Sequence, residues 1–167
     1  MKILFISNDG YDDSELLYPY YRLAEENYDI DIASVEKRII EGKHFFKIEA
    51  NKTLNEVDTD SYDALLLPGG KAPEKLRLVP EVLGITKQFA KANKPIAAIC
   101  HGQQILISAD VLKGKTATCY PGIRDDLKNA GANYVDERVV VDGNLVTSRR
   151  PEDLPYFMKV FIDILKR

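Results

Sequence analysis

The sequence is poor in the residues that build disulfide frameworks and metal centres. Its 167 residues include two cysteines and two histidines. Cys100 and Cys119 form no Cys-x-x-Cys pair and no His/Cys cluster, so the sequence favours neither a zinc site nor a disulfide framework. We therefore expect no metal, no cofactor and a location in the reducing cytoplasm.

Long hydrophobic runs and an excess of positive charge are also missing. The first apolar run, Ile3 to Ile6, has four residues before polar Ser7, which is too short for a signal peptide or a membrane span. The formal net charge is -3, and the charges of both signs are interspersed, so no basic stripe is available to hold a phosphate backbone. We expect a soluble protein that binds neither a membrane nor a nucleic-acid scaffold.

The sequence does contain apolar, strand-like runs that alternate with helical patterns. The patterns predict buried strands at 3–6, 30–33, 64–67 and 96–99, a short strand at 116–119, hairpins at 38–48 and 139–147, and helices at 14–26, 80–92, 102–109, 123–130 and 153–165. No linker or repeat interrupts them. We therefore expect a single α/β domain over residues 1–167, with a doubly wound, mostly parallel sheet sandwiched by helices and with β-hairpin insertions.

Cys100 lies where the apolar run Ile96 to Ile99 ends and a helical pattern begins. Small neighbours, Ala98 and Gly102, allow the sharp turn of a nucleophile elbow, with sulfur in place of a serine oxygen. The helix that follows should direct its N–H groups at the sulfur and favour the thiolate. The sequence thus predicts a catalytic nucleophile, against the alternative of a buried structural cysteine. Cys119 is expected to be core.

Other residues that suit this chemistry lie at the ends of predicted strands. His101 suits a general acid or base, although the sequence leaves open whether its ring lies beside the sulfur or points to a partner surface. Gly69 and Gly70, after the strand 64–67, can supply N–H groups with His101 for an oxyanion hole, or form a plain turn. Tyr120 is a candidate for the pocket lining.

Glu15 lies one turn into the first predicted helix. If its face turns toward the crevice, a protonated carboxyl group there can donate to a thiolate. The alternative is a solvated surface glutamate, and the sequence pattern by itself favours that alternative.

A set of motifs along the whole chain resembles the DJ-1/PfpI superfamily, closest to its intracellular PfpI branch. These motifs are Glu15, Leu67-Pro68-Gly69-Gly70, Ala72-Pro73-Glu74, Ile99-Cys100-His101-Gly102, Tyr120-Pro121-Gly122, Asp142-Gly143-Asn144, Ser148-Arg149 and Pro151-Glu152-Asp153-Leu154.

The resemblance implies a flavodoxin-like fold and a cysteine-dependent hydrolase, acting as a peptidase, a glyoxalase or a deglycase on methylglyoxal-type adducts. It implies Cys100 as nucleophile, Glu15 as its carboxyl partner, and Gly70 and His101 as oxyanion donors. It also implies that Glu74 reaches His101 from a neighbouring subunit, in a homodimer or a hexamer built as a trimer of dimers.

One position departs from the family pattern, and two other functions compete with a hydrolase. Gln103 stands where the branch usually carries proline, which predicts a less rigid helix start and an extra amide near the pocket. Cys100-x-Gly102-x-Gln104 matches part of a glutamine amidotransferase elbow, but no histidine follows His101, so that reading fails. A redox sensor or stress chaperone with an oxidisable Cys100 stays open as the alternative.

Overall fold

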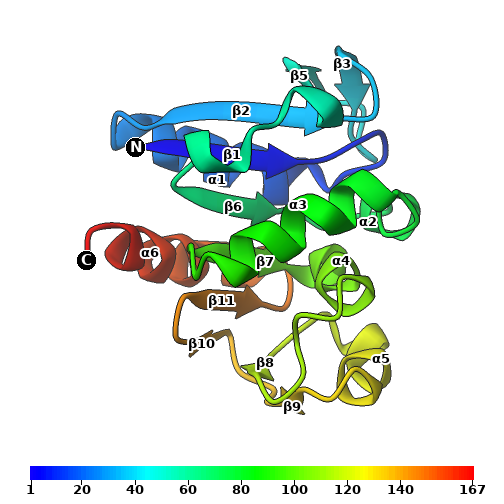
Figure 1. Cartoon of the computed structure of the whole chain (residues 1–167), viewed down its shortest axis with the longest axis vertical. Helices are drawn as coiled ribbons and strands as arrows, with labels where there is room; N and C mark the ends of the chain where they lie inside the picture. The colour runs from blue at the N-terminus through cyan, green and yellow to red at the C-terminus, as the bar shows by residue number, and fades with distance from the viewer.

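The computed structural model describes residues 1–167 as an α/β protein built on a seven-stranded sheet. The strand order is β10-β11-β7-β6-β1-β2-β5, and every neighbouring pair is parallel except β10 with β11. In Figure 1 the parallel strands stack from β2 to β11 with their arrowheads on one side. The predicted fold class is confirmed.

The strands of this sheet are β1 (Lys2–Ile6), β2 (Asp29–Ser34), β5 (Lys52–Thr53), β6 (Ala64–Leu67), β7 (Ile96–Ile99), β10 (Val139–Asp142) and β11 (Leu145–Ser148). Two further pairs are β3 (Arg38–Glu41) with β4 (Lys47–Ala50), and β8 (Thr116–Ala117) with β9 (Asn133–Tyr134). The helices are α1 (Asp13–Glu25), α2 (Ala72–Leu76), α3 (Pro80–Lys91), α4 (Gln103–Ser108), α5 (Arg124–Asn129) and α6 (Leu154–Leu165).

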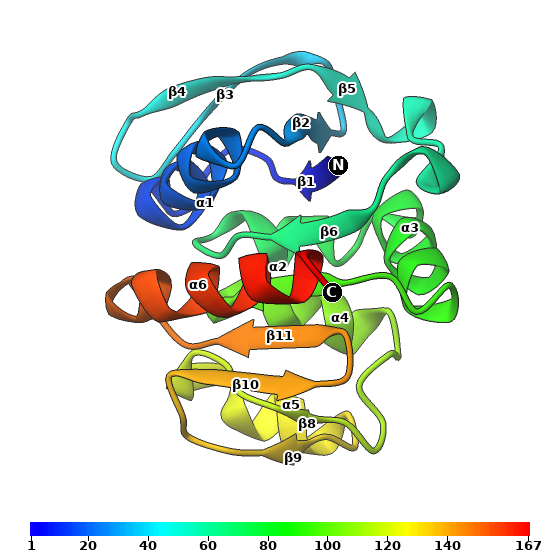
Figure 2. The same ribbon diagram turned by 90° about the vertical axis from the view of Figure 1, so that its left-hand side faces the viewer.

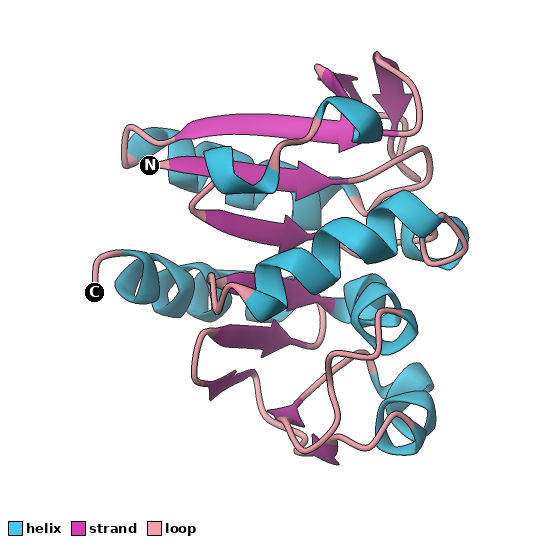
Figure 3. Ribbon diagram, viewed as in Figure 1, coloured by secondary structure: helices cyan, strands magenta, loops and turns pink.

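Helices cover both faces of the sheet. Figure 2 shows α1 and α6 on one side of the strands and α3 on the other. All residues of β6 and β7 are buried, as expected for central parallel strands that read as continuous apolar runs. Figure 3 shows α2 and α4 close to the end of the sheet at which β6 and β7 point, so the loops at this end lie near one another.

Both predicted hairpins form, and they differ in their relation to the sheet. The β3–β4 hairpin is a separate pair outside the main sheet. The β10–β11 hairpin is part of it, because β11 lies parallel to β7. Both hairpins are therefore confirmed, and β11, whose four residues are all buried, joins the main sheet beside β7.

Two predicted elements are shorter than expected. The strand at 116–119 ends at Ala117, because its partner β9 offers only two residues for pairing. The helix expected over 102–109 is α4, and a 3₁₀ turn at Cys100–Gly102 precedes it. Only the hydrogen bonds of the folded chain decide such boundaries.

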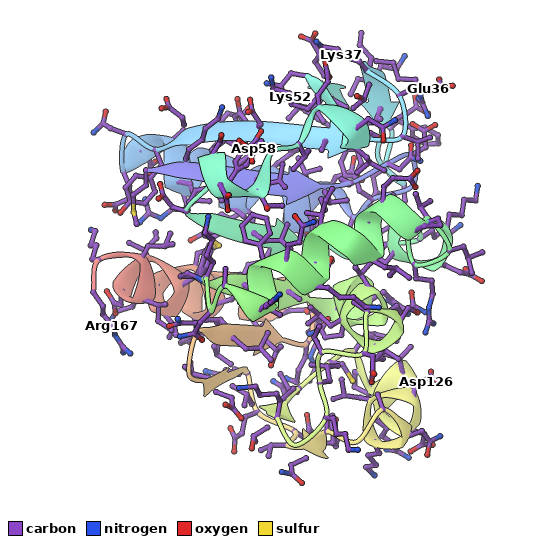
Figure 4. All side chains as sticks on the ribbon, viewed as in Figure 1. Glu36, Lys37, Lys52, Asp58, Asp126 and Arg167 are labelled. Carbon is purple, nitrogen blue, oxygen red and sulfur yellow. The ribbon has the colours of Figure 1, made fainter.

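Charged side chains lie mainly at the periphery. Glu36, Lys37 and Asp126 are exposed and project away from the ribbon (Figure 4). None of the helices combines the length and the apolar composition needed to span a bilayer.

Candidate active site

A pocket of ≈ 460 Å³ lies beyond the carboxyl ends of β6 and β7, where open parallel sheets bind ligands. It contains six of the seven predicted site residues, and Gly69 borders it. The lining residues are Asp12, Glu15, Lys43, Gly70, Lys71, Glu74, Cys100, His101, Gln104, Tyr120 and Pro151. Segments far apart in the sequence thus meet at one place.

Cys100 occupies a strained backbone position directly after β7. Its φ is 62°, in the left-handed region that non-glycine residues rarely adopt. This conformation turns the chain sharply between β7 and the 3₁₀ turn, and the residue is 7% exposed at the pocket floor. The nucleophile-elbow geometry predicted for Cys100 is present.

Glu15 turns inward from α1 and lies against the turn after β6. The residue is fully buried, and its Oε2 accepts the backbone N–H of Gly69 at 2.9 Å. Its Oε1 has no N–H or O–H partner, and its carboxyl group interacts with the Cys100 thiol. Burial, followed by the nearby Asp12 carboxylate, raises the pKa of Glu15 to about 8. The carboxyl group is therefore largely protonated at neutral pH, and the solvated-surface alternative is wrong.

The expected electrostatics at the thiol need a correction. Burial, and then the charge of Glu15, raise the pKa of Cys100. The backbone N–H groups of His101 and Gly70 act in the opposite direction, and α4 is too short and too far along the chain to dominate. Desolvation outweighs the helix terminus, so the thiol needs a base, or a shared proton, to react.

His101 lies beside the sulfur and does not point away. Its Nδ1 is 3.2 Å from Cys100 Sγ, and its ring stacks on Tyr120 with a centroid distance of 4.8 Å. Burial and the charge of Lys43 lower the pKa of His101, so the neutral imidazole is available to accept a proton.

The turn after β6 requires both of its glycines. A side chain at Gly69 would meet Glu15 Oε2 at 2.3 Å and Cys100 Cβ at 2.8 Å. Gly70 has a φ of 87°, and a Cβ there would lie 2.3 Å from the backbone nitrogen of Asp12. The pair therefore does more than end a strand: it brings the Gly70 N–H to the sulfur and lets Glu15 approach closely.

Glu74 lies at the exposed rim of the same pocket, on α2. Its charge acts to raise the pKa of His101, but it forms no ion pair within the chain. The predicted approach of Glu74 from a neighbouring subunit stays a prediction.

Asp12 and Lys43 are pocket residues that the sequence reasoning missed. Asp12 stands three residues before Glu15, a spacing typical of a capped helix start, and this signal was present in the sequence. Lys43 lies in the β3–β4 loop and reaches the pocket only through tertiary folding. No group of three or more histidine, cysteine, aspartate or glutamate side chains is arranged to hold a metal ion.

Comparison with known proteins identifies the family of this chain. The model of the DJ-1/PfpI family matches residues 1–164. The chain belongs to the DJ-1/PfpI family. It is 52% identical to Deglycase PfpI of Pyrococcus furiosus over 166 residues. This alignment covers 99% of this chain and 100% of that protein. It is 39% identical to Protein/nucleic acid deglycase 2 of Escherichia coli, over 98% of this chain and 97% of that protein.

A solved structure supports the DJ-1/PfpI fold independently. It is a two-domain protein of Anabaena variabilis with DJ-1/ThiJ/PfpI-like and ferritin-like domains. The TM-score is 0.97 at 35% identity, over 99% of this chain and 48% of that chain. The family resemblance predicted from the motifs is confirmed.

Gln103 is the departure from the DJ-1/PfpI pattern, and the expectation that its amide lies near the pocket is wrong. It is fully buried and does not line the pocket. Its Nε2 donates to the carbonyl oxygens of Ala98 at 3.1 Å, Thr118 at 2.9 Å and Ser148 at 2.8 Å. The amide therefore joins β7 and β11 to the segment after β8, and the residue beside the pocket is Gln104.

Replacing Gln103 with alanine should destabilise the protein. The two amide N–H groups that serve three carbonyl oxygens would be lost, at a cost of about 1–3 kcal/mol in the free energy of unfolding. Urea unfolding measures this loss, with Gln88→Ala on the exposed face of α3 as the matched control. An unchanged unfolding midpoint in Gln103→Ala would show that the three contacts contribute nothing.

The raised pKa of Glu15 predicts a pH-dependent stability. The pKa of Glu15 is 4.5 in the unfolded chain and about 8 in the folded protein. Its contribution to the free energy of unfolding is therefore complete below pH 4.5 and declines as the pH rises to about 8. The slope is roughly 1.4 kcal/mol per pH unit within this window. Glu15→Gln, which keeps an acceptor for Gly69 and cannot titrate, should lack this component.

Urea unfolding at about pH 5 and about pH 9 tests this prediction. The stability of Glu15→Gln relative to the wild type should increase by a few kcal/mol between the two conditions. The exposed Glu81→Gln serves as the control. A parallel pH dependence in the wild type and Glu15→Gln would mean that Glu15 is ionised in the folded protein.

Proposed function

We propose that the protein is a cysteine-dependent hydrolase that removes methylglyoxal-type adducts from amines. The observation that carries the proposal is the contact of Cys100 Sγ with His101 Nδ1 at 3.2 Å, on a strained elbow beside the protonated Glu15. This is the arrangement of an activated nucleophile with an orienting group. Relatives named deglycases, which share 52% and 39% of the sequence, support the choice of reaction.

The site residues divide the chemistry between them. His101, with its proton on Nε2, accepts the thiol proton at Nδ1. The sulfur electron pair then forms a C–S bond to the carbinol carbon that bears the amine, and the C–N bond at that carbon breaks. The N–H groups of Gly70 and His101 donate to the oxygen on the same carbon, as oxyanion donors do.

The second half of the reaction returns the proton. When the C–N bond breaks, the amine leaves with the bonding electron pair and takes the proton from His101. Water, deprotonated by the neutral imidazole, then replaces the sulfur, and Cys100 is regenerated. Glu15 keeps its proton next to the sulfur throughout and limits the repulsion that a second anion would cause.

The decisive experiment incubates the purified protein with a methylglyoxal-modified amine and, separately, with methylglyoxal and a fluorogenic peptide. Release of free amine that disappears in Cys100→Ser supports the proposal. Cleavage of the peptide alone would replace it with a peptidase, and conversion of free methylglyoxal alone would replace it with a glyoxalase.

A redox sensor is the second candidate, and the position of Glu15 favours it. A protonated carboxyl group that faces the sulfur can donate to a sulfinate oxygen as well as to a thiolate. A sensor should show no turnover on any of the three substrates. Its partner binding or holdase activity should instead appear after peroxide treatment of the wild type and not of Cys100→Ser.

A further inference from the structure

Asp12 lies at the junction of three segments that form the pocket. It is the N-cap residue of α1, and its Oδ1 accepts the N–H groups of Ser14 and Glu15. Its own backbone N–H donates to the carbonyl oxygen of Gly69 at 3.1 Å. Its Oδ2 lies 2.6 Å from Lys43 Nζ, with the Asp12 side chain 6% exposed. One carboxylate thus connects the helix that carries Glu15, the glycine turn and the hairpin loop.

The loop that carries Lys43 is anchored to the start of α1. The Lys43 N–H donates to the carbonyl oxygen of Tyr11 at 2.9 Å. The Asp13 carboxylate accepts the N–H groups of His44 and Phe46, each at 2.9 Å. The ammonium group is therefore presented from an ordered backbone, and its side chain keeps 34% exposure.

We propose that the Asp12–Lys43 ion pair is a positioning element of the Cys100 site: Lys43 supplies positive charge beside the thiolate, and Asp12 holds Lys43 in place and keeps the proton on Glu15. The inference rests on the proposed role of Cys100 as nucleophile and requires no particular substrate.

The charges of the pair act on the nucleophile in opposite directions. The Asp12 carboxylate raises the pKa of Lys43, and the charges of Glu15 and Cys100 raise it further, so the ammonium group is stabilised by negative charge at the thiol. Asp12 adds to the effect of burial on Glu15. Because Glu15 and Cys100 interact, the two groups lose their first proton as a pair. Lys43 favours that loss, and Asp12 opposes it.

Other ionisable groups line the same pocket. The ionisable groups that face Cys100 are Asp12 and Glu15 from the start of α1, Lys43 from the hairpin loop, Lys71 and Glu74 from the segment of α2, His101 from the 3₁₀ turn, and Tyr120 from the segment after β8. Among the lysines, Lys43 is in an ion pair and Lys71 is not, so Lys71 is a matched control for a pocket charge without this role.

The test measures the alkylation rate of Cys100 by iodoacetamide against pH, with mass mapping of the labelled residue. The lower midpoint of this profile reports the first proton loss of the Glu15–Cys100 pair. Lys43→Met should move this midpoint up by about one pH unit, so alkylation at a fixed pH below the midpoint should slow roughly tenfold. Asp12→Asn removes the negative charge, while the amide oxygen can still accept a hydrogen bond from Lys43, so the midpoint should move down by a similar amount. Asparagine is as good an N-cap residue as aspartate, so the start of α1 is preserved.

Two further variants separate charge from structure. Lys43→Arg keeps the charge and should restore a midpoint near that of the wild type, whereas Lys71→Met should leave the midpoint nearly unchanged. If Asp12→Asn proves unstable in thermal melts, the Lys43 variants decide the question by themselves. Equal midpoints in Lys43→Met and Lys71→Met, or shifts of the same sign in Lys43→Met and Asp12→Asn, would overturn the proposal. Because alkylation needs no substrate, a lack of deglycase turnover would leave this result unaffected.

Discussion

Replacing Cys100 with serine should lower turnover on a methylglyoxal-modified amine by about 10³-fold or more. A serine hydroxyl at this position is a far weaker nucleophile than a thiol, because the nearby imidazole must remove a proton of much higher pKa. The Gly70 and His101 N–H groups stay in place, so binding should change less than the rate. Comparison of kcat and KM for the two proteins, prepared in parallel, measures both effects.

Cys119 provides the control for this experiment. It is fully buried, and burial raises its pKa to about 12, as predicted for a core residue. Cys119→Ser should keep most of the activity, and an alkylating agent should label Cys100 first in the wild type. Faster labelling of Cys119 would show that the nucleophile is misassigned.

Replacing Glu74 with alanine should lower turnover by about 10²–10⁴-fold while the subunit stays folded, if Glu74 orients His101 as the third member of a triad. The side chain is exposed at the pocket rim and has no ion-pair partner in its own chain. We expect it to contact His101 of a second copy, in a homodimer or in a hexamer built as a trimer of dimers. Activity should therefore fall when dilution dissociates the assembly.

Specific activity against protein concentration, together with sedimentation, measures this dependence. Glu81→Ala, an exposed glutamate on α3, is the matched control. A fully active monomer, or a Glu74→Ala variant with undiminished turnover, would leave Cys100, His101 and Glu15 as a site contained in one subunit.

The central strands could be predicted from the sequence because each is buried on both faces. β1, β6 and β7 occur within one residue of their expected bounds. A short apolar run between polar segments is typical of a strand that is buried on both faces. The two-residue strands β5 and β9 carry no such pattern. They exist because a neighbouring segment supplies their hydrogen bonds, and this pairing is set by the tertiary fold.

The residues of the candidate site also divide into those with a local sequence signal and those brought to the site only by the tertiary fold. Cys100 and the glycine turn were recognisable because their backbone requirements are local. Lys43 was not, because a lysine in a hairpin loop has no distinguishing neighbours in sequence. The sign of the pKa shift at Cys100 was predicted wrongly, since the helix terminus is a local feature and desolvation depends on the whole fold.

The left-handed backbone at Cys100 has a consequence for directed evolution. A non-glycine residue with a φ of 62° costs about 1–2 kcal/mol relative to a relaxed backbone, and glycine avoids that cost. A library selected only for heat resistance should therefore accept glycine at this position, and the survivors would be inert. Any screen that improves this protein has to score turnover and melting temperature together, because the residue that performs the chemistry is also one that weakens the scaffold.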